Sequence, residues 1–501
     1  MRKRVILFSF VFIAIFACFW VRGAIYLDPD FGYRLKTGEL ILSSSFPEKD
    51  PYSYTMPSFP YVEHAWLVAS FWAYFLPIIG NVGLALVAAI LALGALLISV
   101  SRVESNLLLK KLSTGGSFLF LLATATILPF SGVRAQVFSW FITSILMFIL
   151  FDSRAKKYFA ILPFLFLLWG NLHGSFIAGL AILLLVVVVR WVRKKKIIPK
   201  EFLISVFSFA ATLVNPYGVG GWGEALSSVT DTTLRWQISE WMPAVFMVDL
   251  AFISFLVFST VMIYRFRKRF KIEEVMLYAL VLLAALLSRR HIPLWVIVSL
   301  PLATSALNHF YNEVKSIKNA IPRFKKVYTY TWVGSLILLL SQSFFSIRSA
   351  SFLREDRFYP KNAITFLKSE LPSSEIFSEY GWGGYLVWKL PEKKVFIDGR
   401  MPSWKLREPS SHELTSAFDT YTKLLEGEVD YKKVFNDFGI DTVLWPKNER
   451  LGVAERLAIK IENYFVKNKV EKFDLITQLG KDGWEKIYED ETAFIYKRDK
   501  K

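Results

Sequence analysis

The sequence predicts a polytopic α-helical membrane protein with a C-terminal α/β domain outside the membrane. Three observations predict this class. Of the 501 residues, 54% are hydrophobic, and the mean hydropathy is +0.38. The apolar residues gather in runs that are too long for core strands. The last part of the chain, about 150 residues, contains no such run and is long enough for one domain.

The charge distribution indicates a membrane topology and not a nucleic-acid partner. The chain has 60 basic and 42 acidic residues, a formal net charge of +18. Much of the basic excess lies between apolar runs, which is the pattern that fixes the orientation of membrane helices. The only cysteine, Cys18, lies inside the first apolar run. A disulfide framework and a thiolate metal site are therefore excluded.

The first apolar run is predicted to be an uncleaved membrane helix that begins in the cytoplasm. Three basic residues, Arg2, Lys3 and Arg4, precede an apolar run over about 5–22, which is also the layout of a signal peptide. Phe19, Trp20 and Arg22 crowd the end of this run, so no small-x-small cleavage site closes it. Further apolar runs follow it, as expected of a first transmembrane helix.

Apolar runs continue along most of the chain and alternate with basic clusters. The clusters beginning at Arg154, Arg193, Arg265 and Arg323 are predicted to be cytoplasmic. Counting crossings between them places 171–173, 215–243, 289–291 and everything after 346 on the outer side. The runs lie at about 5–22, 65–79, 82–100, 117–131, 136–151, 158–170, 174–192, 202–214, 245–264, 274–288, 292–307 and 328–346.

The number of crossings has two solutions. The basic N-terminus and the basic 102–111 segment are both predicted to be cytoplasmic, but three apolar runs lie between them. An even number of crossings is required. If 65–79 is an interfacial or re-entrant helix in the first external loop, the chain crosses about 11 times; if one span has been missed, it crosses about 13 times. We favour the first solution.

The composition divides the chain into a membrane part, 1–350, and a soluble extracytoplasmic α/β domain, 351–501. Residues 394–398 and 440–445 are predicted to be short buried strands. Residues 484–488 and 493–496 are predicted to form a hairpin. Helices are expected over 363–371 and 453–466. In 380–385, the glycines are expected in a turn and the aromatics in the core, with a carbohydrate-binding surface as the functional alternative.

The external first loop, about 23–63, holds the segment that we single out first. Asp28 and Asp30 follow the first span together, separated by a proline that stops a helix. The simplest interpretation is a helix cap, and the alternative is a pair of carboxylates with a chemical function. Phe31, Leu35 and Leu42 fall on one helical face, so this part of the loop is also expected to lie on the membrane. Other candidates of the loop are Tyr33, Arg34 and His64.

Polar residues at two further outer corners are candidates for substrate binding. Asn171 and His173 lie between two apolar runs, and Glu240, a second candidate acid, precedes Trp241. Cations on the outer side oppose the usual charge bias. They either snorkel to lipid headgroups or bind a phosphate, which guanidinium groups hold in bidentate fashion. These outward cations are Arg134, Arg289, Arg290 and His291.

The segment Asp28-Pro29-Asp30-Phe31-Gly32-Tyr33-Arg34 resembles the first-loop motif of the GT-C membrane glycosyltransferases. In this superfamily, catalytic subunits of oligosaccharyltransferases carry Asp-Pro-x-x-x-Tyr-Arg at the start of the first external loop, and Asp28, Pro29, Tyr33 and Arg34 match it. Protein O-mannosyltransferases and bacterial lipopolysaccharide-type sugar transferases belong to the same superfamily. The segments 169–175, 238–241 and 396–400 are similar to recurrent segments of these bacterial members. The Trp-Trp-Asp-type motif of oligosaccharyltransferases is absent from the tail, so protein N-glycosylation is not implied.

The resemblance implies transfer of a hexose or pentose from a polyprenyl-phosphate donor to an acceptor outside the cytoplasm, in the bacterial cytoplasmic membrane. The acceptor would be a lipid, a glycan or a protein. Asp28 or Asp30 would be the general base, or both would hold a divalent cation such as Mg²⁺ or Mn²⁺. The outward arginines, with His173 or His291, would bind the phosphate.

Two other functions compete with this interpretation. A polymerase or ligase for surface polysaccharide would also use polyprenyl carriers, but would rely on arginines of a large external loop. A lipid or solute transporter would place charges or broken helices at mid-membrane, whereas the spans here are nearly free of charge at their centres. No Walker loop or other nucleotide motif is present in the sequence, so cytoplasmic nucleotide use has no support.

Overall fold

The computed structural model of the chain describes residues 2–43, 45–102, 117–231, 236–247, 249–317, 320–447 and 473–498. It contains two compact units. Unit 1 comprises residues 1–27 and 62–351, and unit 2 comprises residues 28–61 and 352–501. The sequence assigned the first loop to the membrane part, but in the structure most of that loop, 28–61, belongs to the same unit as the tail.

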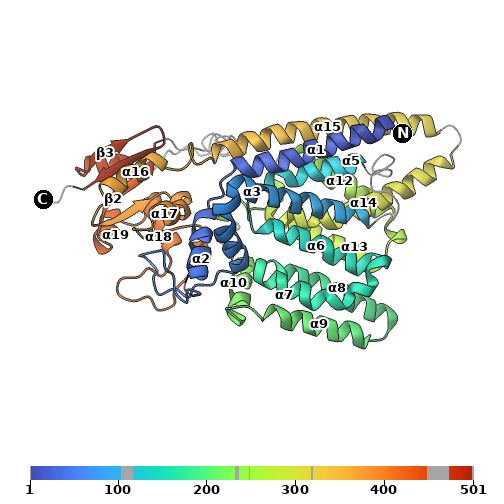
Figure 1. Cartoon of the computed structure of the whole chain (residues 1–501), viewed down its shortest axis with the longest axis horizontal. Helices are drawn as coiled ribbons and strands as arrows, with labels where there is room; N and C mark the ends of the chain where they lie inside the picture. The colour runs from blue at the N-terminus through green and yellow to red at the C-terminus, as the bar shows by residue number, and fades with distance from the viewer. Residues whose placement is uncertain are drawn as a thin grey trace. The chain divides into compact units, whose positions relative to one another are not determined.

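Unit 1 is a bundle of helices that run side by side (Figure 1). Short 3₁₀ turns connect several of them, among them η3 (Ser153–Ile161) and η6 (Arg289–His291). The helices are α1 (Arg2–Ile25), α3 (Trp66–Ser101), α5 (Ser117–Ile127), α6 (Gln136–Phe151), α7 (Leu162–Leu172), α8 (Phe176–Lys194), α9 (Pro199–Thr212), α10 (Val219–Thr230), α12 (Leu250–Arg265), α13 (Ile272–Leu287), α14 (Ile292–Lys315) and α15 (Ala320–Phe352).

Helix α14 forms the centre of this bundle. From Ile292 to Ala303 every residue of the helix is buried, as expected for a helix that is apolar on all sides. The ring of Trp295 packs edge-on against Phe252 and Phe255 of α12, with centroids 5.8 and 5.2 Å apart. The hydroxyl of Ser99 in α3 donates to the backbone oxygen of Ile297 over 2.6 Å. Both contacts hold outer helices against α14.

The lengths and composition of the helices fit a membrane protein. Four described helices, Trp66–Ser101, Phe176–Lys194, Arg289–Lys315 and Ala320–Phe352, are long and apolar enough to cross a membrane, and the bent pair Gln136–Phe151 and Ser153–Leu172 is a further candidate. Shorter apolar helices lie at Ser9–Ile25, Ser117–Phe130 and Leu250–Arg265. The predicted class of fold is thus confirmed, while the number of crossings, 11 or 13, stays a prediction.

The two apolar runs 65–79 and 82–100 form one long helix, α3, with a break. The break is at Gly80, where φ is 63° and ψ is 179°, values outside the helical region. A glycine tolerates this conformation because it has no Cβ. Pro77 lies just before the break and cannot donate a backbone hydrogen bond. A re-entrant first segment is compatible with this break and stays a prediction.

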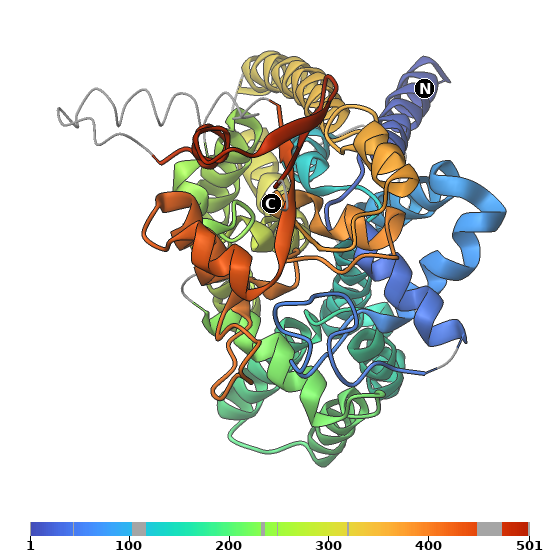
Figure 2. The ribbon, with the colours of Figure 1, turned by 90° about the vertical axis from the view of Figure 1, so that its left-hand side faces the viewer.

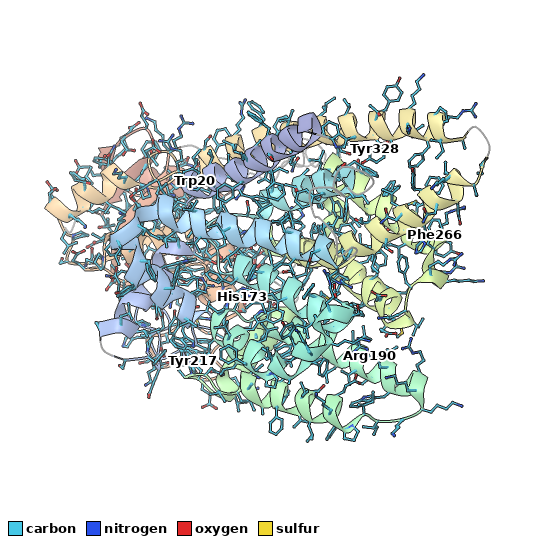
Figure 3. The ribbon with its side chains drawn as sticks, turned by 45° about the vertical axis from the view of Figure 1, so that its right-hand side comes forward. Trp20, His173, Arg190, Tyr217, Phe266 and Tyr328 are labelled. Atoms are coloured by element: carbon cyan, nitrogen blue, oxygen red, sulfur yellow. The ribbon has the colours of Figure 1, made fainter. Side chains whose placement is uncertain are left out.

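The bundle of unit 1 has two chemically different ends. Arg190, Phe266 and Tyr328, which are near three of the basic clusters, lie toward one end, and His173 and Tyr217 lie toward the other (Figure 3). At the first end, Glu273 lies 3.7 Å from Arg190 and 3.4 Å from Arg193. This arrangement follows the charge pattern of the sequence. Which end faces the cytoplasm stays a prediction.

Unit 2 contains a four-stranded mixed sheet with the order β1-β2-β4-β3. Strand β1 pairs in parallel with β2, and β2 and β3 pair antiparallel with β4. The hairpin β3–β4 lies beside β2 in Figure 2. The elements are α2 (Phe31–Ser43), α16 (Lys361–Ser369), β1 (Glu375–Ser378), η7 (Tyr380–Trp382), α17 (Gly383–Lys389), η8 (Met401–Ser403), α18 (Ala417–Glu426), α19 (Tyr431–Asp437), β2 (Ile440–Pro446), α21 (Leu475–Lys481), β3 (Glu485–Glu489) and β4 (Ala493–Lys497).

Several predicted elements of the tail are confirmed. The strand at 440–445, the hairpin and the helix at 363–371 correspond to β2, β3–β4 and α16. The predicted strand 394–398 is wrong: among the described residues, this segment makes only an isolated parallel bridge, between Val395 and Ser53 of the first loop. Strand β1 was missed because it is only four residues long. The predicted helix 453–466 lies outside the described residues.

Helix α2 packs against the tail through most of the face that was predicted to lie on the membrane. Phe31 and Leu35 are buried within unit 2, and only Leu42 of the predicted face is exposed. Figure 2 shows α2 beside the segment that contains α17. A Cβ on Gly384 would overlap the backbone oxygen of Pro29, so these two backbones approach each other as only glycine allows. The apolar face of α2 therefore packs against other residues of unit 2.

Candidate functional site

The segment Asp28–Arg34, here called the aspartate segment, begins α2 in unit 2. The Oδ1 atom of Asp28 accepts the backbone N–H of Asp30 over 2.9 Å, and the backbone oxygen of Asp28 accepts from Phe31. Asp28 is buried, with 7% of its surface exposed, whereas Asp30 is partly exposed. The contacts of Asp28 are those of a helix cap. A Cβ on Gly399 would overlap Oδ1 of Asp30, so the Asp30 carboxylate lies directly on the backbone at Gly399.

Arg400 holds this region of unit 2 together. Its guanidinium pairs with Asp398 and with Asp50 of the first loop, each over 2.5 Å, and its side chain is 5% exposed. Burial alone would lower the pKa of Arg400, but the charges of Asp398 and Asp50 raise that pKa well above its usual value. Since Asp50 also accepts the backbone N–H of Ser53, its carboxylate has a structural role.

Tyr33 and Arg34 of the aspartate segment lie in the same part of unit 2. Both are buried. The guanidinium carbon of Arg400 lies 5.5 Å from the centre of the Tyr33 ring, and that of Arg34 lies 5.3 Å from it. Two cations thus lie within cation–π distance of the Tyr33 ring, which is a stabilising interaction.

Unit 1 brings together several of the predicted outward cations. Arg134 lies just before α6 and pairs with Glu240. The backbone N–H of Arg290 donates to the backbone oxygen of Glu240 over 3.0 Å, and that of Arg289 donates to Met242 over 3.0 Å. We call the group of Arg22, Arg134, Arg289, Arg290, Glu240 and Trp241 the arginine corner.

Trp241 forms the apolar floor of the arginine corner. Its ring is buried, with the guanidinium of Arg290 4.8 Å from its centre and the ring of His291 at 6.4 Å. The Nε atom of Arg289 and the hydroxyl of Ser288 are buried, and neither has a hydrogen-bond partner within the described ranges. Buried donors without a partner are rare in folded proteins, and a bound ligand is one explanation for them.

Three arginines act on the carboxylate of Glu240. Burial alone would raise the pKa of Glu240. The charges of Arg134 and Arg290, the hydrogen bond from Arg134 and the smaller effect of the Arg22 charge together outweigh burial and hold that pKa below its usual value. The side chain of Glu240 is nevertheless 36% exposed, against 12% for Arg134. The corner therefore contains an ionised, accessible carboxylate among cations, which suits ion pairing better than proton transfer.

His173, Asn171 and His64 form a second cluster in unit 1. The Nδ1 atom of His173 accepts the backbone N–H of Ser175 over 3.2 Å, so the proton of the neutral imidazole lies on Nε2. The ring of His64 lies edge-on to it at 5.7 Å. Asn171 accepts from the indole of Trp66 and donates to the backbone oxygens of Leu167 and Val214. Asn171 therefore ties helices together, while His173 is held in one orientation.

A divalent cation at Asp28 and Asp30 of the aspartate segment stays a prediction. Among the described residues, no group of three or more histidine, cysteine, aspartate or glutamate side chains is placed to hold a metal ion. One oxygen of Asp28 is already engaged by the backbone of Asp30. Mg²⁺ and Mn²⁺ prefer several oxygen ligands, so we derive no step through a metal.

Two residues of interest escaped the sequence analysis. Arg22 ends α1, and its Nη2 donates to the backbone oxygen of Pro129 over 2.5 Å. A cation at the outer end of the first span was the signal that could have identified it. The other is Glu379, which follows β1 in unit 2. Its Oε2 is buried and accepts no hydrogen bond from the part of the chain that the structure describes.

We expect Glu379 to make the stability of the protein depend on pH. Burial raises its pKa to about 7, against the lowering effect of backbone hydrogen bonds from Gly381 and Trp382. Between the unfolded pKa, about 4.3, and 7, the folded chain binds the proton and the unfolded chain does not, so stability falls as the pH rises. We expect Glu379→Gln to be more stable than wild type by roughly 3–4 kcal/mol at pH 8, but by only about 1 kcal/mol at pH 5.

Thermal unfolding followed by tryptophan fluorescence at both pH values checks this expectation. Glu485→Gln, which changes an exposed carboxylate on β3, is the control and should unfold like wild type at both. If Glu379→Gln and Glu485→Gln have the same unfolding temperatures at both pH values, the buried carboxylate of Glu379 is not the titrating group.

Comparison with known proteins shows the fold. No protein-family profile and no curated protein matches the sequence. The apo crystal structure of ArnT from Cupriavidus metallidurans matches with a TM-score of 0.50 and 10% identity, over 98% of this chain and 97% of that one. ArnT is a GT-C glycosyltransferase. The chain therefore has the fold of the GT-C class, as the resemblance predicted.

Two further crystal structures are similar at a lower level. ArnT from Cupriavidus metallidurans bound to undecaprenyl phosphate matches with a TM-score of 0.48 and 11% identity, over 98% of this chain and 97% of that one. The Archaeoglobus fulgidus oligosaccharyltransferase, in complex with zinc and sulfate, matches with a TM-score of 0.48 and 12% identity. That match covers 84% of this chain and 64% of the oligosaccharyltransferase.

Proposed function

We propose that the protein is a membrane glycosyltransferase that moves a sugar from a polyprenyl-phosphate donor to an acceptor outside the cytoplasm. The observation that carries the proposal is the arginine corner. Three guanidinium groups, from the end of α1, the start of α6 and η6, act on one accessible carboxylate. Arginine is the residue that best recognises phosphate, because its planar donors match two phosphate oxygens.

The corner would bind the phosphate of the donor and stabilise it as it leaves. A leaving phosphate gains negative charge in the transition state, and fixed cations that face it lower the barrier. The buried Nε of Arg289 offers a further donor. Trp241, His291 and the histidine cluster with His64, Asn171 and His173 would line the substrate site. Polyprenyl carriers are lipids, which suits a protein of the GT-C fold with apolar helices.

The general base of the reaction would be Asp30 of the aspartate segment. Asp28 acts as a helix cap, whereas Asp30 is partly exposed and its carboxylate lies on the backbone of Gly399. In the proposed step, Asp30 takes the proton of the acceptor hydroxyl, and the acceptor oxygen forms a bond to the anomeric carbon. The bond from that carbon to the phosphate oxygen breaks, and its electron pair leaves with the polyprenyl phosphate. Tyr33 and Arg34 of the same segment would position Asp30.

Reconstitution of the purified chain in liposomes tests this function against its competitors. We expect a polyprenyl-phosphate sugar to be consumed and polyprenyl phosphate to be released, with transfer to a lipid, glycan or protein acceptor. Arg134→Gln should slow the release by roughly 100-fold, while Arg265→Gln, which changes an exposed ion pair with Glu313, should not. Translocation of the donor without its consumption would favour a transporter, and elongation of a glycan on the carrier would favour a polymerase.

A further inference from the structure

Glu240 takes the place in the arginine corner where a ligand's anionic oxygens would bind. Its carboxylate pairs with Arg134 and also lies within the field of Arg290 and Arg22. The backbone of the same residue is fixed, because its oxygen accepts the N–H of Arg290 over 3.0 Å. A phosphate that binds Arg134 must therefore compete with a carboxylate that is already present and held close to it.

We propose that Glu240 is a specificity-determining residue that makes the arginine corner prefer dianionic phosphate monoesters over monoanionic phosphate diesters. This inference rests on the proposed phosphate-binding function of the corner. A carboxylate has one charge and two oxygens. A phosphate diester has the same charge and two terminal oxygens, so it gains little by replacing Glu240. A monoester has up to two charges and three terminal oxygens, so it displaces the carboxylate from Arg134.

The preference has a use in sugar transfer. A lipid-linked sugar phosphate is a diester, as are the headgroup phosphates of ordinary phospholipids, and the phosphate becomes a monoester as the sugar leaves. With Glu240 present, Arg134 pairs with the carboxylate in the ground state. Arg134 transfers its interaction to the phosphate only as the second negative charge develops on that phosphate. An interaction that is stronger in the transition state than in the ground state accelerates the reaction. Glu240 also weakens the binding of headgroup diesters, as it weakens ground-state binding of the donor diester.

The electrostatics of the corner support this role. Glu240 is ionised at neutral pH, because the cations hold its pKa below the usual value. It is also accessible, with 36% of its side chain exposed, so a ligand reaches it without unfolding the loop. The buried, unpartnered Nε of Arg289 remains as a donor that Glu240 does not satisfy.

Binding of two synthetic probes to the purified full-length chain tests the proposal. The probes are dodecyl phosphate, a monoester, and methyl dodecyl phosphate, a diester with the same alkyl chain, both at pH 8. Titration calorimetry in a non-ionic detergent measures both affinities. In wild type we expect the monoester to bind more tightly than the diester. Glu240→Gln keeps the shape of the side chain and removes its charge, so it should tighten diester binding roughly tenfold. The ratio of monoester affinity to diester affinity should therefore be smaller than in wild type.

Glu313→Gln is the matched control, since Glu313 also pairs with an arginine, Arg265, over 2.7 Å, but outside the corner. This variant should leave both affinities unchanged. If Glu240→Gln leaves the ratio of the two affinities at its wild-type value while both probes bind, the specificity role of Glu240 is overturned and the phosphate site stands. If neither probe binds wild type or any variant, the proposed phosphate site falls, and the inference falls with it.

Discussion

Replacing Asp30 by asparagine is expected to lower sugar transfer by at least about 100-fold and to leave the chain folded. General-base catalysis contributes about 10²–10⁴-fold, and an amide cannot take the acceptor proton. Asp28→Asn is the matched comparison, since asparagine caps a helix as well as aspartate does and keeps the oxygen that accepts the Asp30 N–H. Its transfer rate should stay within a few-fold of wild type.

The two variants are compared by initial rates of donor consumption, with thermal unfolding as the check on folding. Loss of activity in Asp28→Asn alone would assign the general base to Asp28 and contradict the interpretation of Asp28 as only a helix cap. Full activity in both variants would remove the aspartate segment from the chemistry. Asp28→Ala should cost about 1 kcal/mol of stability, because alanine cannot cap the helix.

Replacing Arg400 by glutamine is expected to produce the largest loss of stability. The change leaves Asp50 and Asp398, both fully enclosed, without their shared counter-ion. Removing one partner of a buried ion pair costs about 3–5 kcal/mol. The ring contacts of the guanidinium with Tyr33, Tyr52, Tyr61 and Trp404 would be lost as well. In unit 2, this corresponds to a fall in the unfolding temperature of roughly 10 °C.

Limited proteolysis and thermal unfolding of the full-length chain measure this effect. The control is Lys432→Met, which removes a largely exposed ion pair with Asp482 and should cost less than about 1 kcal/mol. Equal unfolding temperatures for the two variants would show that the Arg400 cluster does not hold unit 2 together.

Local patterns made much of the fold predictable. Long apolar runs predicted the membrane helices, and alternating apolar residues around a short acidic turn predicted the β3–β4 hairpin. A helix cap was one of the two interpretations of the aspartate segment, because proline and aspartate act on their immediate neighbours. Each of these signals lies within a few residues of the element that it predicts.

The organisation of unit 2 could not be predicted, because it depends on residues far apart in the chain. Asp50 and Arg400 are separated by 350 residues, and neither carries a local sign of the other. The same holds for Gly384, which needs glycine only because the backbone of Pro29 lies against it. The apolar face of α2 therefore looked like a membrane-binding face, although its partner is the tail.

The candidate site was predicted in part for the same reason. Charge bias identified Arg134, Arg289 and Arg290 as outward cations, and the structure brings them together around Glu240 and Trp241. Arg22 was missed because it ends an apolar run and was interpreted only as a boundary. Glu379 was missed because the raised pKa comes from burial, which the sequence does not reveal.

The central claim is that the arginine corner binds the phosphate of a polyprenyl carrier. A cryo-electron microscopy structure of the full-length chain with bound polyprenyl phosphate tests it most directly. We expect phosphate density on Arg134 and Arg290, with the carboxylate of Glu240 turned away from Arg134. Phosphate density elsewhere, with the pair of Arg134 and Glu240 intact, would contradict it.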